Sequence, residues 1–282
     1  MKNSEIIKLF VISAQGTLLN MPSSAQIIRR FKTDGLLQHS GIKKTFLYVL
    51  AAAAFLFSCS KSKKTETNFS SNLATKAETK AQFNNTSFGV YKGVVAGSTG
   101  YIIFKINNGD GIVKGYLTYN NTSDTLTTTE VITAGQPIYA HFTGRFSSMD
   151  FYADANGAHS FVTNVTINGN TNELIFVVHE NSDKQVLCYE GTLSGSNNAT
   201  GIFNCARVGT NNGDTAFVLA KAVISTYTEI REFGQVINNS LNVAPVNDTL
   251  FTIQGVFSDI NFNGTWSSVS RGSGTFTCKR TL

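Results

Sequence analysis

The chain has few of the residues on which metal and nucleophilic chemistry usually depend. Its 282 residues include only four cysteines and four histidines. No His-x-x-x-His or Cys-x-x-Cys spacing is present, so no zinc motif stands out. The sequence also has no Gly-x-Ser-x-Gly elbow and no P-loop. We therefore assign no catalytic residue, no metal and no cofactor. A hydrolase acting on envelope or dietary polysaccharide stays open as an alternative, because paired carboxylates form in space and leave no sequence motif.

The histidines of the C-terminal part, His141, His159 and His179, are interpreted as surface or strand-end residues. His141 alternates with Tyr139, so both side chains are expected on the outer face of one strand.

A short apolar run precedes Cys59. Thr45–Phe57 holds 13 residues without charge, after Lys43 and Lys44. As a helix it would rise about 20 Å, less than the roughly 30 Å hydrocarbon core of a membrane. These lengths favour the apolar part of a signal peptide over a permanent membrane span.

The end of this run resembles the signal peptide of bacterial lipoproteins. An aliphatic residue, Leu56, lies three positions before Cys59, and the small Ser58 lies directly before it. The resemblance implies cleavage before Cys59 and a lipid on its sulfur, which would anchor the protein in a membrane. The alternative is a short buried helix with a core cysteine. The Ser/Lys/Thr-rich stretch that follows argues against burial.

Four segments follow from this reading. Residues 1–42 are a cytoplasmic extension or, as we favour, a mis-assigned start, and residues 43–58 are the signal peptide. Residues 59–85, rich in Ser, Thr, Lys and Asn, are expected to be a lipid-anchored flexible linker. Residues 86–282 form an antiparallel β domain. The expected location is the cell envelope, on an outer membrane facing the periplasm or the cell surface.

The basic character of the chain comes from its N-terminal part. Seven of the 23 basic residues and two of the 18 acidic residues lie in residues 1–58. The remainder carries 16 of each and is neutral. Nucleic acid is therefore not an expected partner, because binding it needs a basic face on the folded domain.

Residues 86–282 consist mostly of strand signals. Runs rich in Val, Ile, Phe, Tyr and Thr alternate with Gly/Asn/Asp clusters such as Asn168-Gly169. Connections this short allow antiparallel neighbours but not parallel crossovers. The predicted strands are 88–95, 101–106, 112–119, 125–133, 138–146, 149–153, 160–167, 173–178, 185–193, 201–208, 215–224, 249–257, 260–266 and 274–279. Tyr227–Asn239 is the exception, because Ile230, Phe233 and Ile237 fit a short helix.

The predicted fold is all-β, an antiparallel meander of about 12–14 short strands. It forms a β-barrel or a β-sandwich, as one large or two small units, with at most one short helix.

A hairpin unit occurs twice, at 189–207 and 262–280, and each matched residue differs in number by 73. In both copies an apolar residue, a glycine and a second large residue share one strand face. Glycine at such a position lets a strand bend, or lets a large side chain cross over it. The pattern is similar to that of the small up-and-down barrels of the calycin type, the lipocalins and avidins. That resemblance implies a barrel and, as an alternative function, a small-ligand carrier.

Three cysteines remain after Cys59, so at most one internal disulfide can form. A hairpin closed at Ser194–Ala199 would place Cys188 and Cys205 directly opposite each other, within disulfide range. The alternative is that both are small buried apolar residues.

The preferred function is binding or structural. The partners considered are the membrane, through the lipid on Cys59, and a glycan, a small apolar ligand or a protein. Aromatic residues in the glycine-rich strands could stack on a ligand, although such residues more often belong to a core. These candidates are Tyr116, Tyr119, Phe151, Tyr152 and Trp266.

Overall fold

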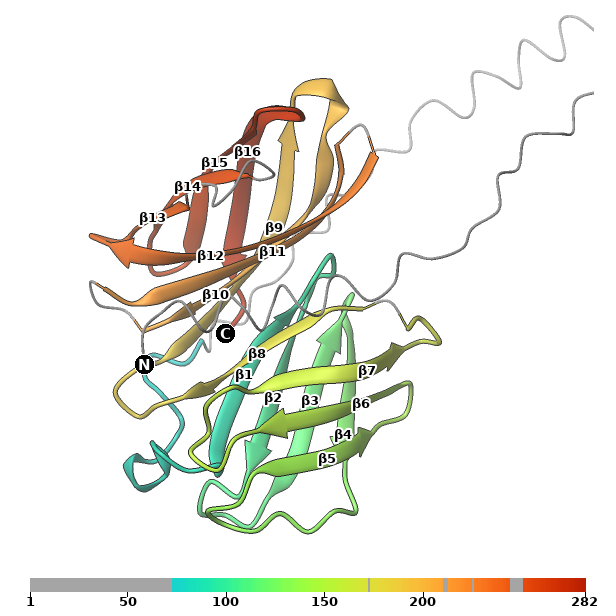
Figure 1. The fold of residues 1–282 in the computed structure, drawn as a ribbon, viewed down its shortest axis with the longest axis vertical. Helices are drawn as coiled ribbons and strands as arrows, with labels where there is room; N and C mark the ends of the chain where they lie inside the picture. The colour runs from blue at the N-terminus through green and yellow to red at the C-terminus, as the bar shows by residue number, and fades with distance from the viewer. Residues whose placement is uncertain (1–72, 172, 210–212, 225, 244–250) are drawn as a thin grey trace, which may run out of the picture. The chain divides into compact units, whose positions relative to one another are not determined.

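The computed structural model describes residues 73–282, except 172, 210–212, 225 and 244–250. The predicted signal peptide and Cys59 lie outside the described residues. In the described part the fold is all-β and antiparallel, as predicted. It has 16 strands, more than the 12–14 expected, and two 3₁₀ turns. It forms two eight-stranded sheets, one from β1–β8 and one from β9–β16 (Figure 1).

The first sheet is barrel-like, and its strand order is β7-β6-β5-β4-β3-β2-β1-β8. Its interior is closely packed, and the rings of Phe104 and Phe151 stack there with centroids 4.5 Å apart. The strands are β1 (Gly89–Val95), β2 (Gly100–Ile106), β3 (Val113–Tyr119), β4 (Thr122–Thr127), β5 (Ile138–Thr143), β6 (Ser147–Ala153), β7 (Phe161–Ile167) and β8 (Ile175–Glu180).

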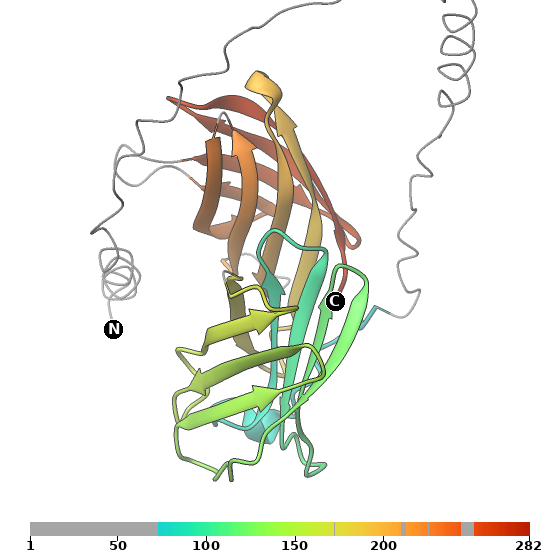
Figure 2. The same cartoon turned by 90° about the vertical axis from the view of Figure 1, so that its right-hand side faces the viewer.

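The second sheet is a closed up-and-down barrel, in which β16 pairs with β9 (Figure 2). Its interior is filled by buried side chains such as Tyr189, Phe262 and Trp266. The strands are β9 (Val186–Gly195), β10 (Thr200–Val208), β11 (Thr215–Ile224), β12 (Thr226–Ile237), β13 (Ser240–Val243), β14 (Thr252–Phe257), β15 (Asn261–Ser268) and β16 (Gly272–Arg280).

The repeated unit is a β-hairpin in both copies, β9–β10 and β15–β16. The register explains its residue pattern, because a large residue faces a small one on each inward rung. The pairs are Tyr189–Cys205, Gly191–Phe203 and Leu193–Gly201 in the first copy, and Phe262–Cys278, Gly264–Phe276 and Trp266–Gly274 in the second. A Cβ built on Gly191 would overlap the carbonyl oxygen of Thr277 on β16. The glycines therefore let neighbouring backbones approach as the barrel coils.

The short helix predicted over Tyr227–Asn239 is wrong, because this segment forms β12. Ile230 and Val236 point into the barrel, whereas Phe233 and Ile237 are 55% and 56% exposed on its outside. The apolar residues are thus divided between two faces, and their spacing imitates a helix. The next strand, β13, has four residues and was not predicted.

Asn-Asn pairs make several of the tight turns. Asn120 and Asn121 join β3 to β4 with φ angles of 46° and 64°, and Asn238 and Asn239 join β12 to β13 with 51° and 60°. Two successive positive φ angles are what a two-residue hairpin turn requires, and asparagine tolerates this conformation.

The described residues of the two sheets belong to one compact unit. An apolar cluster joins them, with Val94 and Ala96 from the first sheet and Cys188, Ala206 and Leu219 from the barrel. The rings of Phe176 and Phe217 stack across the same interface, with centroids 4.0 Å apart. Strand β1 is consequently buried on both faces.

Residues 73–85 are held against this unit, although the sequence placed them in a flexible linker. The side chain of Gln185 donates a hydrogen bond of 2.8 Å to the carbonyl oxygen of Ala74, and Arg280 donates to the same oxygen. A 3₁₀ turn, η1 (Ala81–Phe83), follows. The folded part therefore begins by residue 73, earlier than the predicted boundary at 86.

A buried ion cluster holds this N-terminal segment in place. Lys92 on β1 is 1% exposed and lies 2.8 Å from carboxylate oxygens of both Glu78 and Glu180. Glu180 also accepts hydrogen bonds from the backbone N–H groups of Glu78 and Val186. The buried charges of Lys92 and Glu180 therefore both have partners of opposite charge, as burial of a charged group requires.

The direct opposition of Cys188 and Cys205 is wrong by one residue. Cys205 pairs with Tyr189, and Cys188 pairs with Ala206. A shift of one residue moves a side chain to the other face of a strand. Cys205 consequently points into the barrel and Cys188 into the cluster between the sheets, and both are buried free thiols, as is Cys278.

Candidate functional site

An exposed row of three aromatic residues crosses the outer face of β5, β6 and β7, the neighbouring yellow-green strands of Figure 1. Tyr139 pairs with Tyr152, and Tyr152 pairs with Phe161. The ring centroids are 4.8 Å apart in the first pair and 4.6 Å in the second. Tyr139 is 76% exposed and Phe161 43%, so the free ring surface lies mainly at the two ends of the row. We call these three residues the aromatic row.

A histidine–aspartate pair flanks the row on one side. His141 is the next outward residue of β5 after Tyr139, and Asp150 holds the same position on β6. The Nδ1 atom of His141 lies 2.5 Å from Oδ1 of Asp150, and the amide of Asn164 donates to Oδ2 at 2.6 Å. The hydrogen bonds from Asn164 and His141 lower the pKa of the Asp150 carboxyl. Asp150 therefore stays an anionic acceptor.

A second pair flanks the row on the other side. The hydroxyl of Tyr152 donates to Oδ1 of Asp154 at 2.5 Å, and Nδ1 of His159 lies 2.6 Å from Oδ2. These two bonds lower the pKa of the Asp154 carboxyl, and the bond to Asp154 raises the pKa of Tyr152 to about 12. The row thus lies between two anchored carboxylates.

A β-bulge places Asn164 on this face. The register between β6 and β7 shifts between Ser148 and Asp150, and Asn164 has a left-handed φ of 50°. Two successive residues of β7, Thr163 and Asn164, are consequently exposed. Bulges redirect side chains in this way.

The five aromatic residues proposed from the sequence are not brought together. Tyr152 lies in the aromatic row, whereas Phe151 and Trp266 are buried in the two cores. Tyr116 and Tyr119 are half-buried on β3, and the hydroxyl of Tyr119 donates to Glu173 at 2.9 Å. Strand alternation explains this division, because Phe151 and Tyr152 are neighbours and point to opposite faces.

The histidines also divide. Tyr139 and His141 share the exposed outer face as predicted, and His159 is exposed. His179 lies at the end of β8, as predicted, but is buried there, with Nε2 2.9 Å from the carbonyl oxygen of Phe88, and burial lowers its pKa. Sequence reasoning assigned no binding role to Tyr139, Phe161, His141, Asp150, Asp154, His159 or Asn164. The sequence did contain one signal for this site. Tyr139 and His141 on one predicted strand, and Asp150 and Tyr152 on the next, are spaced two residues apart and so share a face.

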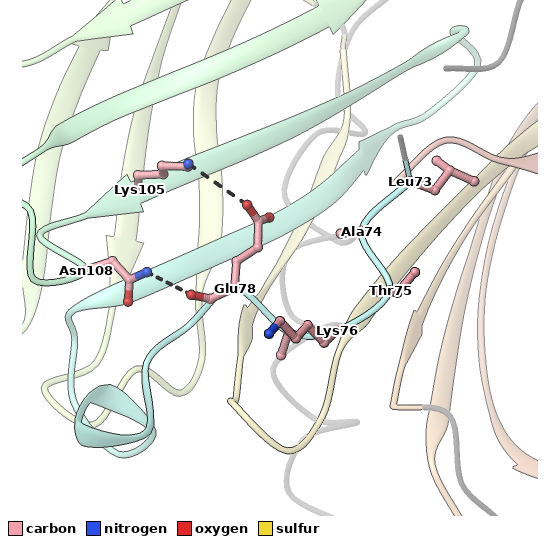
Figure 3. A pocket seen from close by; sticks show the side chains of 8 residues that line it. Leu73, Ala74, Thr75, Lys76, Glu78, Lys105 and Asn108 are labelled. Atoms are coloured by element: carbon pink, nitrogen blue, oxygen red, sulfur yellow. Dashed lines mark hydrogen bonds and ion pairs between the residues drawn. The ribbon is translucent and has the colours of Figure 1, made fainter. Parts of the chain in front are cut away.

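A hollow lies elsewhere, between residues 73–78 and the side chains of Lys105 and Asn108 (Figure 3). It has a volume of about 540 Å³ and is open to solvent. Its polar groups already contact one another. Asn108 donates to the carbonyl oxygen of Glu78 at 2.9 Å, and the carboxylate of Glu78 lies 4.0 Å from Lys105. This hollow is therefore part of how the N-terminal segment is held.

No family model, curated protein or solved structure matched the chain when it was compared with each. In the described residues, no group of three or more His, Cys, Asp and Glu side chains is arranged to hold a metal ion. Within the same part of the chain, no helix has the length and apolar character to span a membrane.

Proposed function

We propose that the protein is a membrane-anchored extracytoplasmic lipoprotein whose β domain binds a partner and catalyses no reaction. The lipid on Cys59 would hold it in the cell envelope, on an outer membrane facing the periplasm or the cell surface. The sequence around Leu56, Ser58 and Cys59 supports the anchor. Intact mass of the membrane-extracted protein tests it. A mature chain that begins elsewhere than Cys59 contradicts the anchor.

The aromatic row is the single observation that carries the binding role. Aromatic rings that are exposed on the outer face of a sheet are unfavourably hydrated unless a partner covers them, and the three adjacent rings form one partly exposed patch. The row lies on a sheet face rather than in a cleft, which supports binding over hydrolysis. Buried aromatic side chains occupy the interiors of both sheets, which favours a partner on the outer surface over a small ligand carried inside a barrel.

A glycan is the ligand that this surface fits best. Sugar rings present C–H faces to aromatic rings and hydroxyl groups to polar side chains. The row offers the first contact, and Asp150 and Asp154 with their histidines offer the second.

Binding by the full chain to a panel of glycans tests this role. Tyr139→Ala should abolish binding or weaken it by about ten-fold or more, since a desolvated aromatic contact is worth roughly 1–3 kcal/mol. Phe233→Ala removes an aromatic residue of the barrel's outer face that is 55% exposed, and it should leave binding unchanged. Equal effects of the two substitutions would place the binding surface elsewhere.

A further inference from the structure

The two sides of the aromatic row have matching polar groups. Asp150 and Tyr152 occupy successive outward positions on β6, and Asp154 directly follows the end of that strand, so the two carboxylates lie before and after the central residue of the row. Each carboxylate contacts one histidine through Nδ1, at 2.5 Å for His141 and 2.6 Å for His159. The row is therefore bracketed by the same acid–histidine pair on each side.

Hydrogen bonds hold both carboxylates in place but leave some of their acceptor sites unoccupied. Each oxygen of Asp150 and Asp154 receives one hydrogen bond from a neighbouring side chain. A carboxylate has about four acceptor sites, so each keeps capacity for further donors. Among the described residues, neither aspartate forms an ion pair with a lysine or arginine. The bracket is thus a negative surface with vacant acceptor sites.

The neighbouring side chains add groups of the opposite kind. The Nε2 atoms of His141 and His159 can donate or accept, and the Asn164 amide carries both functions. A hydroxyl group also both donates and accepts, so vicinal hydroxyls match this mixed array. A simple cation needs acceptors alone.

We propose that the aromatic row selects neutral glycans and rejects acidic ones, with Asp150 and Asp154 accepting hydrogen bonds from sugar hydroxyls. This selectivity rests on the proposed glycan-binding function. A uronic acid placed on the row would bring its carboxylate towards two fixed carboxylates, and like charges placed side by side weaken binding. The hydroxyl groups of a neutral sugar carry no charge, so the two aspartates do not repel them.

The test compares a neutral hexose oligosaccharide with its counterpart oxidised at C6 to uronic acids, both binding to the full chain at neutral pH. We expect the neutral form to bind about ten-fold or more tightly, and the preference to shrink in high salt, which screens exposed charges. The double variant Asp150→Asn, Asp154→Asn should reduce the preference to about three-fold or less, because it removes both charges and keeps the side-chain shapes. Asp183→Asn, which changes an exposed aspartate in the turn between β8 and β9, is the matched control and should keep the full preference.

Each outcome decides something. Equal or tighter binding of the acidic form, or a preference that survives the double substitution, overturns the selectivity and leaves the glycan-binding function intact. Failure of the unmodified chain to bind either glycan refutes the proposed function itself. Oligolysine serves as a third probe, and aspartate-dependent binding of it without glycan binding would replace the glycan by a basic peptide.

Discussion

The rings of Phe203 and Phe276 stack face to face, with centroids 4.2 Å apart and planes 2° apart. The two residues hold equivalent positions in the repeated hairpin. Strand β9 lies between their strands, and Gly191, directly opposite Phe203, has no side chain to separate the rings. The repeat therefore brings its own two copies into contact at the seam where the barrel closes.

Gly191→Ala should destabilise the protein by about 2 kcal/mol or more, because the added methyl group overlaps the backbone of β16. Urea unfolding measures the change. Thr192→Ala alters the next residue, which is exposed on the outer face, and should cost under about 1 kcal/mol. Similar losses for the two variants would show that the close approach at Gly191 is not required.

Lys92→Met should destabilise the protein by about 3–5 kcal/mol, since it leaves Glu180 buried without its cation. Adding Glu180→Gln removes that charge and should restore part of the loss. Lys105→Met is the control, because the Lys105 side chain is 33% exposed and its ammonium lies 4.0 Å from Glu78, and the substitution should change stability by about 0.5 kcal/mol or less. Chemical unfolding of the three variants distinguishes a structural ion cluster from a dispensable one.

The contribution of Glu190 to stability should fall between about pH 4.5 and pH 7. Burial raises the pKa of Glu190 from 4.5 to about 7, so in this range the folded protein holds a proton that the unfolded chain has released. The unfolded state is then favoured as pH rises, by up to roughly 3 kcal/mol for this residue. Burial raises the pKa of Glu232 to about 7 as well, and it acts in the same direction.

Glu190→Gln should remove the Glu190 part of this loss. The unfolding free energy of the variant should therefore fall less between pH 4.5 and pH 8 than that of the unmodified chain. Unfolding free energies at the two pH values give the comparison. A pH dependence unchanged by the substitution would mean that Glu190 is solvated.

The thiols should be inert in the native protein. Cys188, Cys205 and Cys278 are buried, and burial raises the pKa of the Cys188 thiol to about 12. Thiol titration should find no rapid reaction until urea is added. The denatured protein should then expose three thiols if Cys59 carries a lipid and four if it does not. Fewer than three without reductant would indicate a disulfide.

The strands of this protein could be predicted largely from the sequence, and the candidate site could not. Hydrophobic runs and turn residues are local, so β10 and β11 were located almost to the residue. Strand β12 was not predicted, because its residues do not alternate between apolar inward and polar outward positions. Glu232 and Gly234 point inward, whereas Phe233 and Ile237 point outward. The disulfide prediction was wrong because the register of the β9–β10 hairpin differs by one residue from the predicted one. The turn of this hairpin contains Asn197 and Asn198, which both have positive φ angles.

The aromatic row depends on pairing between three strands. Tyr139 and Tyr152 are 13 positions apart and Tyr152 and Phe161 are 9 apart, and only the register of β5, β6 and β7 makes them neighbours. Tyr152 was proposed for its residue type alone. Its partners could be chosen only once the bulge at Asn164 and the outward face were known.

The contacts of Ala74 and Glu78 with the folded unit would limit the distance between the domain and the proposed lipid anchor. With a lipid on Cys59, only the 14 residue steps from there to Leu73 separate the bilayer from the first described residue. Such a chain spans at most about 50 Å, at roughly 3.3–3.6 Å per residue. A flexible linker that ran from Cys59 to residue 85, as the sequence suggested, would span nearly twice that distance. If Cys59 carries the proposed lipid, the domain is confined to a layer within about 50 Å of the lipid headgroups and meets the partners that enter that layer.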